Sequence, residues 1–213
     1  MKQAKILLFL FITLFAFIVV GCSQETTLNE TFDEPGRWAF GDDVYAVAGV
    51  IDGVYRFDVQ ADTGSFWTTA GKSFSNGIYE VSVTQTSGTQ DIGYGMMLRV
   101  DSSLDEFYLF EISSDGQVWI GRCIERCVQQ EMLIGNWWFE TAAINRGLNQ
   151  TNVLRVNAEF ANLSFYINDI LIGQVTDETH VEGDIGLYVE TLGNGNVQVE
   201  FDNFTVDSIE SPE

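Results

Sequence analysis

The feature that most constrains the fold of this 213-residue chain is a two-residue alternation of apolar and polar side chains along most of its length. Such alternation is typical of strands with one buried face. Turn-forming stretches such as Ser75-Asn76-Gly77 and Gly193-Asn194-Gly195 separate the runs at roughly ten-residue intervals. After the N-terminal segment, no stretch keeps the 3.6-residue apolar period of a helix for several turns. The pattern predicts an all-β, two-sheet antiparallel sandwich of the jelly-roll kind.

Ten runs show the alternation clearly enough to be expected as strands: Val54–Val59, Gly77–Gln85, Gly93–Val100, Phe107–Ser113, Gln117–Cys123, Val153–Ala158, Leu163–Ile167, Leu171–Thr176, Asp184–Glu190 and Val197–Asp207. The piece Leu28–Phe32 is expected to pair with the last run. No internal repeat or low-complexity linker divides the chain, and one sandwich suits its length. We expect a single domain over residues 28–208, followed by a tail at 209–213.

The first 21 residues have the layout of a secretory signal peptide. Met1–Lys5 is basic, and Ile6–Val20 carries no charge. The apolar run is shorter than the about 20 residues that a membrane-spanning helix needs. The sequence predicts a cleaved signal peptide over residues 1–21, with an uncleaved membrane anchor as the alternative.

The segment Val19-Val20-Gly21-Cys22 resembles the bacterial lipobox, in which the cysteine thiol receives a diacylglyceryl group. The resemblance implies cleavage before Cys22, acylation of Cys22 and a short lipidated tether at 22–27. Two or three acyl chains anchor a protein stably, because each buried CH₂ adds about 0.8 kcal/mol. We therefore expect an exported protein on the outer face of the cell membrane, or on the outer membrane where the organism has one.

The charge of the chain excludes nucleic acid as a partner. There are 31 acidic and 10 basic residues, for a formal net charge of −21, and two of the lysines lie in the predicted signal peptide. Such a chain is repelled by nucleic acid and by anionic lipid surfaces. The carboxylates suit Ca²⁺, whose ligands are oxygens, or they keep a surface protein soluble.

Two cysteines remain after Cys22 is assigned to lipid, Cys123 and Cys127. Export permits a disulfide between them. The bridge requires Cα atoms about 4.4–6.8 Å apart, so residues 124–126 would have to form a tight turn rather than continue a strand. A zinc site would need further ligands beside the lone His180, and free thiols are the other alternative. We expect the disulfide, which would pin the tip of a hairpin.

Six segments carry a resemblance to a known superfamily: Gly95–Val100, Phe107–Gly116, Asn152–Val156, Phe165–Asp169, Gly183–Leu187 and Phe201–Phe204. In this order they resemble the concanavalin A-like lectin/glucanase superfamily. The nearest branches are the 3-keto-disaccharide hydrolase-like domain of unknown function and the laminin G-like modules. The resemblance covers nearly all of the chain after the tether. It implies two curved sheets with ligand sites on the concave face or rim loops, but no single activity, because such folds host many.

The sequence predicts no catalytic residues. The glucanases of the superfamily carry Glu-x-Asp-x-x-Glu on one strand, which places the acids side by side on one face. The nearest piece here begins at Glu111, but Asp115 falls in a turn and no second acid lies in the strand. His180 lies in an acidic loop without a nucleophile motif near it. This absence argues against a glucanase and leaves enzymatic activity undecided.

A ligand-binding face is expected instead on three successive strands. The alternation assigns Tyr108 and Phe110 to the core. The opposite side would then carry Met97, Arg99, Leu109, Glu111 and Trp119. Arginine and glutamate bind hydroxyl groups, and an indole face stacks on a sugar ring. The alternative is an ion pair between Arg99 and Glu111 on neighbouring strands.

Trp137 and Trp138 add further candidates for ligand binding. They stand together in a region with a weak strand pattern, and adjacent residues of a strand cannot both face the core. At least one is expected to be exposed, as aromatic residues in binding sites are, although a loop packing back on the sandwich is equally consistent. Trp38 and Trp67 are expected in the core.

A calcium site is one interpretation of the acidic residues at the two ends of the domain. Asp202 of the last strand could act with Glu30 or Asp33 near the first strand, as in jelly-roll carbohydrate-binding modules. The alternative is that Asp202 faces solvent on an edge strand.

The sequence as a whole favours a membrane-anchored, extracytoplasmic module that binds glycans. One alternative is a hydrolase of modified (3-keto) glycosides, as the family resemblance implies. The other is a structural or adhesion protein that binds another surface protein.

Overall fold

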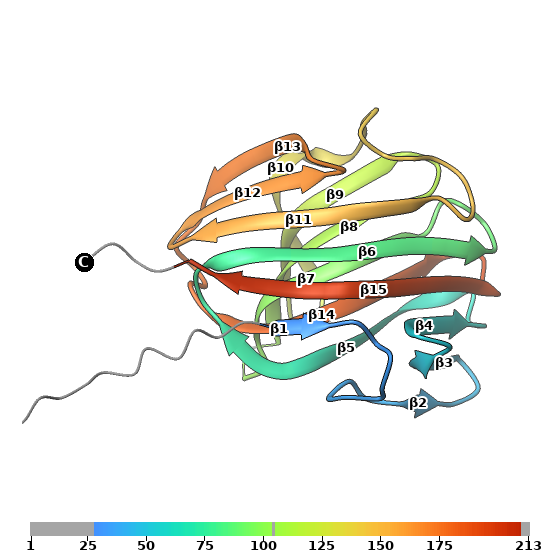
Figure 1. Cartoon of the computed structure of the whole chain (residues 1–213). Coiled ribbons are helices and arrows are strands. Elements are labelled where there is room, and N and C mark those ends of the chain that lie inside the picture. The colour runs from blue at the N-terminus through green and yellow to red at the C-terminus, as the bar shows by residue number, and fades with distance from the viewer. Residues whose placement is uncertain (1–27, 104, 210–213) are drawn as a thin grey trace, which may run out of the picture.

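The computed structural model describes residues 28–103 and 105–209, and the regular structure in these residues is entirely β-strand (Figure 1). The predicted signal peptide, the predicted lipid-attachment residue Cys22 and the predicted tether lie outside the described residues. In the described part, no helix is long and apolar enough to cross a membrane.

The strands form two antiparallel sheets. Sheet A contains β1 (Leu28–Glu30), β2 (Gly41–Asp42), β3 (Ala46–Ile51), β4 (Val54–Val59), β6 (Gly77–Ser87), β11 (Thr151–Glu159), β12 (Asn162–Ile167), β13 (Ile170–Thr176) and β15 (Val197–Ser208). Its spatial order is β13-β12-β11-β6-β15-β4-β3-β2, with β1 beside β15. Sheet B contains β5 (Thr63–Phe74), β7 (Gly93–Asp101), β8 (Glu106–Ile112), β9 (Gln117–Ile124), β10 (Gln129–Glu140) and β14 (Gly183–Leu192). Its order is β10-β9-β8-β7-β14-β5.

The alternation in the sequence places the core between the two sheets. In β6, Tyr79, Val81 and Val83 are at most 1 % exposed, while the residues between them face outward. Phe110 of sheet B meets Phe165 of sheet A edge to face, with ring centroids 5.4 Å apart. The predicted all-β sandwich of two antiparallel sheets is confirmed.

Each of the ten expected strands corresponds to an observed strand, and the expected pairing of the two chain ends is confirmed by Leu28 lying opposite Val206. The pattern missed β2, β3, β5 and β10. Both β5 and β10 are edge strands of sheet B, so their two faces are less sharply divided into apolar and polar.

The expected disulfide between Cys123 and Cys127 is confirmed at the β9–β10 hairpin. The Cα atoms lie 4.3 Å apart. Glu125, Arg126 and Cys127 all adopt positive φ, between 51° and 66°. The chain therefore reverses direction at these residues, which is the tight turn that the disulfide was expected to require.

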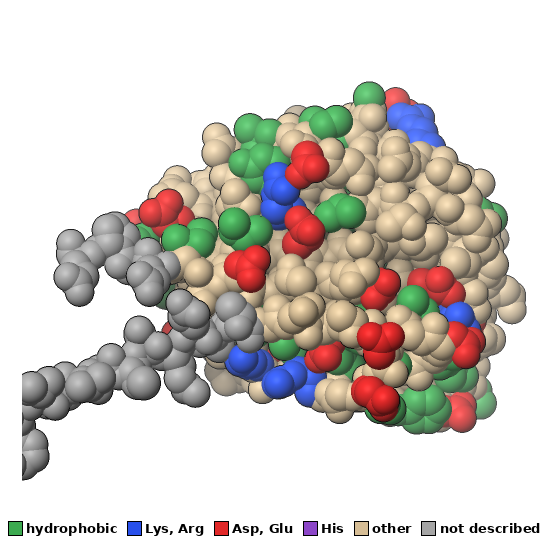
Figure 2. Space-filling model, in the orientation of Figure 1, with side chains coloured by type: hydrophobic (Ala, Val, Ile, Leu, Met, Phe, Trp, Pro, Cys, Tyr) green, Lys and Arg blue, Asp and Glu red, His purple; other side chains and the backbone are tan. Residues whose placement is uncertain are grey.

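The outer face of sheet A is polar and sparsely charged. Figure 2 shows this face, with most of its area formed by neutral side chains and backbone. Arg155 lies there between Glu80 and Asp169. Acidic and apolar side chains gather instead over β2 and β3, at the lower right of the view, where Val44 and Tyr45 are 82 % and 61 % exposed.

Candidate functional site

The outer face of sheet B, which points away from sheet A, carries a second apolar cluster. Its members are Met97, Phe107, Leu109, Trp119, Cys123 and Tyr188, none more than 4 % exposed. Trp138 and Met132 of β10 pack against them. The middle of this face is therefore a packed apolar floor rather than an open groove.

Glycines in the middle strands allow long side chains to lie flat on this floor. A Cβ at Gly121 would lie 2.8 Å from Cζ2 of Trp119, so the indole covers the glycine. A Cβ at Gly93 would collide with Oε2 of Glu111 and lie 2.9 Å from Cγ of Glu190. Any larger residue at these two positions would displace the side chains that shape the face.

The structure brings four of the predicted ligand-binding residues to this face: Met97, Glu111, Trp119 and Trp138. Glu111 lies opposite Trp119 in the β8–β9 register, and Leu109 lies opposite Met97 between β8 and β7. The predicted sides of these strands are confirmed, and the role of the residues in binding stays a prediction.

The placement predicted for Arg99 is wrong. The β7–β8 register shifts between Leu98 and Asp101, and Arg99 adopts a φ of 50°, which breaks the alternation. Its guanidinium donates hydrogen bonds to the carbonyls of His180 (2.8 Å) and Phe160 (2.7 Å), and the side chain is 1 % exposed. No ion pair joins Arg99 to Glu111 in the described part of the chain, so the alternative interpretation is wrong as well.

Glu111 instead shares the face with a second acid, Glu190. Glu111 is 2 % exposed, and its Oε2 finds no hydrogen-bond partner among the described residues. Burial raises the pKa of Glu111 well above its usual 4.5, and the charge of Glu190 raises it further. Burial also raises the pKa of Glu190. Two carboxyl groups in one poorly solvated place resist ionising together.

Tyr188 connects this acidic pair to the edge strand β5. Its hydroxyl donates to Oγ of Ser65 at 2.7 Å and lies 3.5 Å from Oε2 of Glu190. Burial, with the two glutamates nearby, raises the pKa of Tyr188 strongly. Tyr188 therefore stays a neutral hydrogen-bonding group at any physiological pH.

A small pocket of about 160 Å³ opens next to the acidic pair. The described residues that line it are Asp91, Ser113, Asp115, Gln117, Trp138 and Leu192. Asp91 precedes Gly93 by two residues, Ser113 follows Glu111 by two, and Leu192 follows Glu190 by two. In extended chain, residues two apart lie about 7 Å from one another on the same side, so these three lining residues lie next to the acidic pair on the outer face of sheet B. The volume is below the ~300–1,000 Å³ of pockets for drug-sized molecules and suits a single ring.

The β8–β9 turn holds the polar side of this pocket in place. The Ser113 hydroxyl donates to Asp115 Oδ1 and accepts the backbone N–H of Gln117 at 3.1 Å. The backbone closes the turn as well, because Ser113 N–H donates to the Gln117 carbonyl at 2.9 Å. Gly116 supplies a φ of 104°, which other residues rarely adopt. The Asp115 carboxylate and the Ser113 hydroxyl are thus held in place by the turn, in a pocket that Trp138 also lines.

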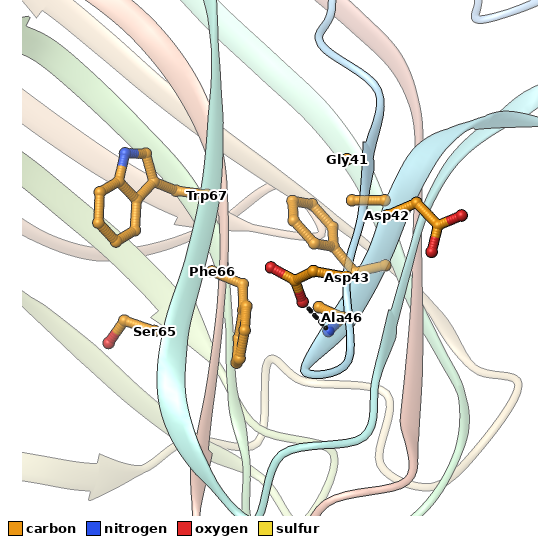
Figure 3. Close-up of a pocket in the computed structure, with 9 residues that line it drawn as sticks. Gly41, Asp42, Asp43, Ala46, Ser65, Phe66 and Trp67 are labelled. Atoms are coloured by element: carbon orange, nitrogen blue, oxygen red, sulfur yellow. Dashed lines mark hydrogen bonds between the residues drawn. The ribbon is translucent and has the colours of Figure 1, made fainter.

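A larger cavity of about 280 Å³ lies between β5 and the β2–β3 hairpin (Figure 3). Phe66 points into it, while Ser65 and Trp67 project to the other side of β5. Its carboxylate Asp43 already accepts hydrogen bonds from the N–H groups of Tyr45 and Ala46, and those bonds lower the pKa of Asp43. We therefore regard this cavity as the open end of the core rather than the ligand site.

The four predicted tryptophans other than Trp119 have different environments. Trp38 is in the core, as expected, but Trp67 is 42 % exposed on the outer face of sheet B, so its core prediction is wrong. Trp137 is 57 % exposed and does not line the pocket. Trp138 is half-buried and forms the pocket wall. The two adjacent indoles of β10 therefore differ, because Trp137 is exposed and Trp138 forms part of the pocket wall.

The predicted calcium ligands are not gathered by the fold. Asp202 accepts hydrogen bonds from Asn203, Asp33 accepts the Thr31 hydroxyl, and Glu30 accepts the Trp38 indole N–H at 3.0 Å. Within residues 28–103 and 105–209, no group of three acidic, histidine or cysteine side chains could hold a metal ion.

Sequence reasoning missed most of the pocket. Asp91, Ser113, Asp115, Gln117 and Leu192 are at strand ends, where the alternation fades. Glu190 had a usable signal, since it lies on the polar side of an expected strand, but its neighbour across the sheet follows only from the order β8-β7-β14. The second acid that is absent from β8 is thus Glu190 of β14, which lies beside Glu111 across β7.

Comparison with known proteins establishes the fold. No protein-family model matches the chain, and no curated protein matches it in sequence. Among solved structures it is similar to the carbohydrate-binding module CBM66 from Bacillus subtilis, at 20 % identity and a TM-score of 0.55, covering 82 % of this chain and 98 % of the module.

Two glucanases are also similar. The β-glucanase of Bacillus licheniformis shares 13 % identity with a TM-score of 0.62, over 86 % of this chain and 98 % of the enzyme. The catalytic domain of an endo-1,3-β-glucanase (laminarinase) from Thermotoga petrophila RKU-1 shares 11 % identity with a TM-score of 0.60, over 86 % and 97 %. The domain therefore has the jelly-roll fold of concanavalin A-like lectins and glucanases.

Proposed function

We propose that the protein binds glycans in the pocket on the outer face of sheet B. The observation that carries the proposal is that Trp138 lines one pocket with the Asp115 carboxylate and the Ser113 hydroxyl, which the β8–β9 turn holds in place. A sugar ring presents an apolar face that stacks on an indole and a rim of hydroxyls that donate to carboxylates. The pocket offers both in a volume that suits one ring.

The similar solved structures support this proposal at the level of the fold. One is named a carbohydrate-binding module and two are named glucanases. Trp67 extends the aromatic surface at the far edge of the same face, where it lies opposite Tyr188 in the β14–β5 register. Residues Met97 and Trp119 belong to the buried floor and would shape the site from beneath rather than contact a ligand.

We also propose that the protein acts outside the cytoplasm, held to a membrane by lipid on Cys22. The support is the sequence alone: the lipobox-like Val19-Val20-Gly21-Cys22 directly after an uncharged run. The first described strand begins at Leu28, so few residues would separate the lipid from the domain.

A glycan-array screen of the detergent-solubilised full-length protein, with and without Ca²⁺, tests the proposed function. Binding to a defined set of glycans is the expected result. Binding that depends on Ca²⁺ would show that glycan recognition requires the ion, although the fold does not gather Asp202, Glu30 and Asp33 into a site for it. An array without bound glycans in either condition would reject the proposal and shift the search to a protein partner on intact cells.

A hydrolase of modified glycosides is the second candidate, and the acidic pair favours it. Glycoside hydrolysis uses two carboxyl groups, one kept protonated by its surroundings. Glu111 and Glu190 lie on one face and both have raised pKa values. Bond cleavage in 3-keto and ordinary glycosides, lost in Glu111→Gln and in Glu190→Gln, would support this activity. Substrates that remain intact with the wild-type protein would reject it.

A further inference from the structure

The β2–β3 end of the sandwich carries an exposed apolar and acidic surface that the proposed glycan pocket does not use. Every residue from 39 to 45 is exposed, and the Phe40 side chain is 69 % exposed. Figure 2 shows apolar and acidic side chains together at this end. Exposed apolar patches with a polar rim mark interaction sites. We call this surface the hairpin patch, formed by Phe40, Asp42, Asp43, Val44 and Tyr45.

The hairpin patch adjoins the cavity of about 280 Å³ between β5 and the β2–β3 hairpin. Ala48, Phe57 and Phe66 give this cavity apolar walls, and Phe66 points into it (Figure 3). An apolar cavity of about 150 Å³ is large enough to hold a benzene ring. The cavity beside the patch therefore has room for one aromatic or branched side chain of a partner.

The free edges of the two sheets meet at the same place. β2 ends the strand order of sheet A and β5 ends that of sheet B, so each has one side without a strand neighbour in the described part of the chain. β2 pairs with only two residues of β3, Val47 and Ala48. An extended segment can add to such an edge through its backbone while its alternate side chains enter pockets. The geometry therefore fits an extended chain.

Charge restricts the chemistry of that segment. Asp42 and Asp43 belong to the patch, and Asp43 extends toward Phe66 across the cavity (Figure 3). None of the described residues that line the cavity is Lys, Arg or His. A basic partner is attracted to this surface, whereas nucleic acid or an anionic lipid surface is repelled. A second copy of the chain brings the same acids and a net charge of −21, so it is repelled as well.

The hairpin patch also lies far from the start of the described chain. Ala46, next to the patch, pairs with Val59, and Val59 pairs with Val197 at the start of β15. Leu28 pairs with Val206, nine residues further along β15. At about 3.3 Å per residue the two places are about 30 Å apart, at opposite ends of the sandwich (Figure 1). The patch is thus remote from the lipid anchor proposed before Leu28, which favours a protein partner over the anchoring membrane.

We propose that the hairpin patch docks an extended segment of a basic partner protein. One apolar side chain of the segment enters the cavity, and Lys or Arg side chains on either side of it lie beside Asp42 and Asp43. No residue of the patch lines the pocket that contains Trp138, so this inference is independent of the proposed glycan binding.

The test begins with a library of random short peptides displayed on phage, selected on the full-length protein in detergent. Peptides in which a large apolar residue is flanked by Lys or Arg are expected to be enriched. The best of them is synthesised together with a copy in which Glu replaces each Lys and Arg, and both are titrated by fluorescence anisotropy. The basic peptide should bind at least about tenfold more tightly than the acidic copy, and added salt should weaken its binding.

Three changes in the protein locate the binding. Val44→Ser/Tyr45→Ser removes exposed apolar surface, and Asp42→Asn removes an exposed charge. Gly41→Leu fills the mouth of the cavity without a clash, because a Cβ at Gly41 would meet no atom within 4 Å. The serine double variant and Gly41→Leu should each weaken peptide binding at least about tenfold, and Asp42→Asn about threefold. Thermal unfolding of each variant is measured alongside.

The controls remove the same kinds of group elsewhere. Val128→Ser/Ile170→Ser replaces apolar residues that are 78 % and 53 % exposed outside the patch. Glu159→Gln removes an exposed acid at the end of β11. Both controls should bind the basic peptide as tightly as the wild type.

Four outcomes would overturn the inference. The first is equal peptide binding by the wild type and the folded patch variants, and the second is a selection that enriches no peptides or only acidic ones. Wild-type dimers that are lost in Val44→Ser/Tyr45→Ser would assign the patch to a second copy of the chain. Flotation of the Cys22→Ser protein with phosphatidylcholine vesicles, lost when the two serines are added, would assign it to a lipid surface.

Discussion

Glu111 of β8 and Glu190 of β14 extend toward one another over Gly93 of β7, the strand that separates them. The glycine makes the arrangement possible, because any Cβ at that position would occupy the place of the Glu111 carboxyl group. A fold that buries two acids over one glycine accepts a stability penalty at neutral pH, and such penalties concentrate at functional sites.

The first prediction concerns stability and pH. In the folded state the pKa of Glu111 is well above 4.5, so this state holds a proton that the unfolded chain loses above about pH 4.5. Stability is therefore undiminished below that pH and falls as the pH rises through the folded pKa. Glu111→Gln removes this loss. Its melting temperature should match the wild type near pH 4 and exceed it at pH 8. The difference should be about 2–4 °C for each 1 kcal/mol of unfolding free energy that the charged Glu111 costs.

Thermal unfolding at both pH values measures this difference. Glu159→Gln is the control and should follow the wild type throughout. A Glu111→Gln variant that is no more stable than the wild type at pH 8 would mean that the carboxyl group has a partner that stabilises its charge.

The second prediction concerns Arg99. The guanidinium holds three segments together through the carbonyls of His180, Phe160 and, at 3.5 Å, Ser75. Arg99→Ala leaves buried acceptors unpaired and should lower the free energy of unfolding by about 3 kcal/mol, measured by urea denaturation. Arg146→Ala, which removes a half-exposed arginine, should change it by less than about 0.5 kcal/mol. If Arg99→Ala kept the stability of the wild type but lost glycan binding, Arg99 would have to act in ligand binding rather than in holding the three segments together.

The third prediction concerns the disulfide. Cys123 and Cys127 close a loop of only a few residues, for which the chain-entropy model gives about 2 kcal/mol. Reduction by dithiothreitol should lower stability by no more than about that amount and leave the sheets folded, as followed by circular dichroism. Global unfolding on reduction would show that the bridge is needed to hold β9 and β10 together.

The fourth prediction concerns Cys22, which lies outside the described residues. If a lipid is attached there, mass spectrometry of the N-terminal peptide will show cleavage before Cys22 and added acyl mass, and detergent phase separation will recover the protein with the lipid. Cys22→Ser should move it to the aqueous phase, whereas the double variant Cys123→Ser/Cys127→Ser should stay membrane-bound. A Cys22→Ser protein that still partitions with the membrane would exclude lipid on Cys22 as its anchor.

The fold was predictable because its information is local. Each core strand alternates on its own, as Tyr79, Val81 and Val83 do, and the disulfide followed from spacing and backbone geometry. Arg99 was assigned to the wrong face because the two-residue alternation holds only along a regular strand. The bulge between Leu98 and Asp101 turns its side chain to the opposite face. Trp67 was misplaced because β5 is an edge strand whose apolar residues face both ways.

The site was only partly predictable because it depends on strand order. Glu111 was found from the alternation of its own strand, and Trp138 from its place beside Trp137 in a region of weak strand pattern. Glu190 joins Glu111 only through β7, which lies between β8 and β14 in the sheet. The polar pocket residues Asp115 and Gln117 belong to a turn, and the sequence shows that a turn exists there without showing which surface it borders.

The most direct test of glycan binding compares two adjacent tryptophans. Trp138 forms the pocket wall, whereas Trp137 is exposed beside it and does not line the pocket. Calorimetric titration with the best glycan from the array should show that Trp138→Ala weakens binding by about 2 kcal/mol, roughly 30-fold, while Trp137→Ala stays within about twofold of the wild type. Equal affinity in Trp138→Ala and the wild type, with the variant shown to be folded, would contradict binding in this pocket.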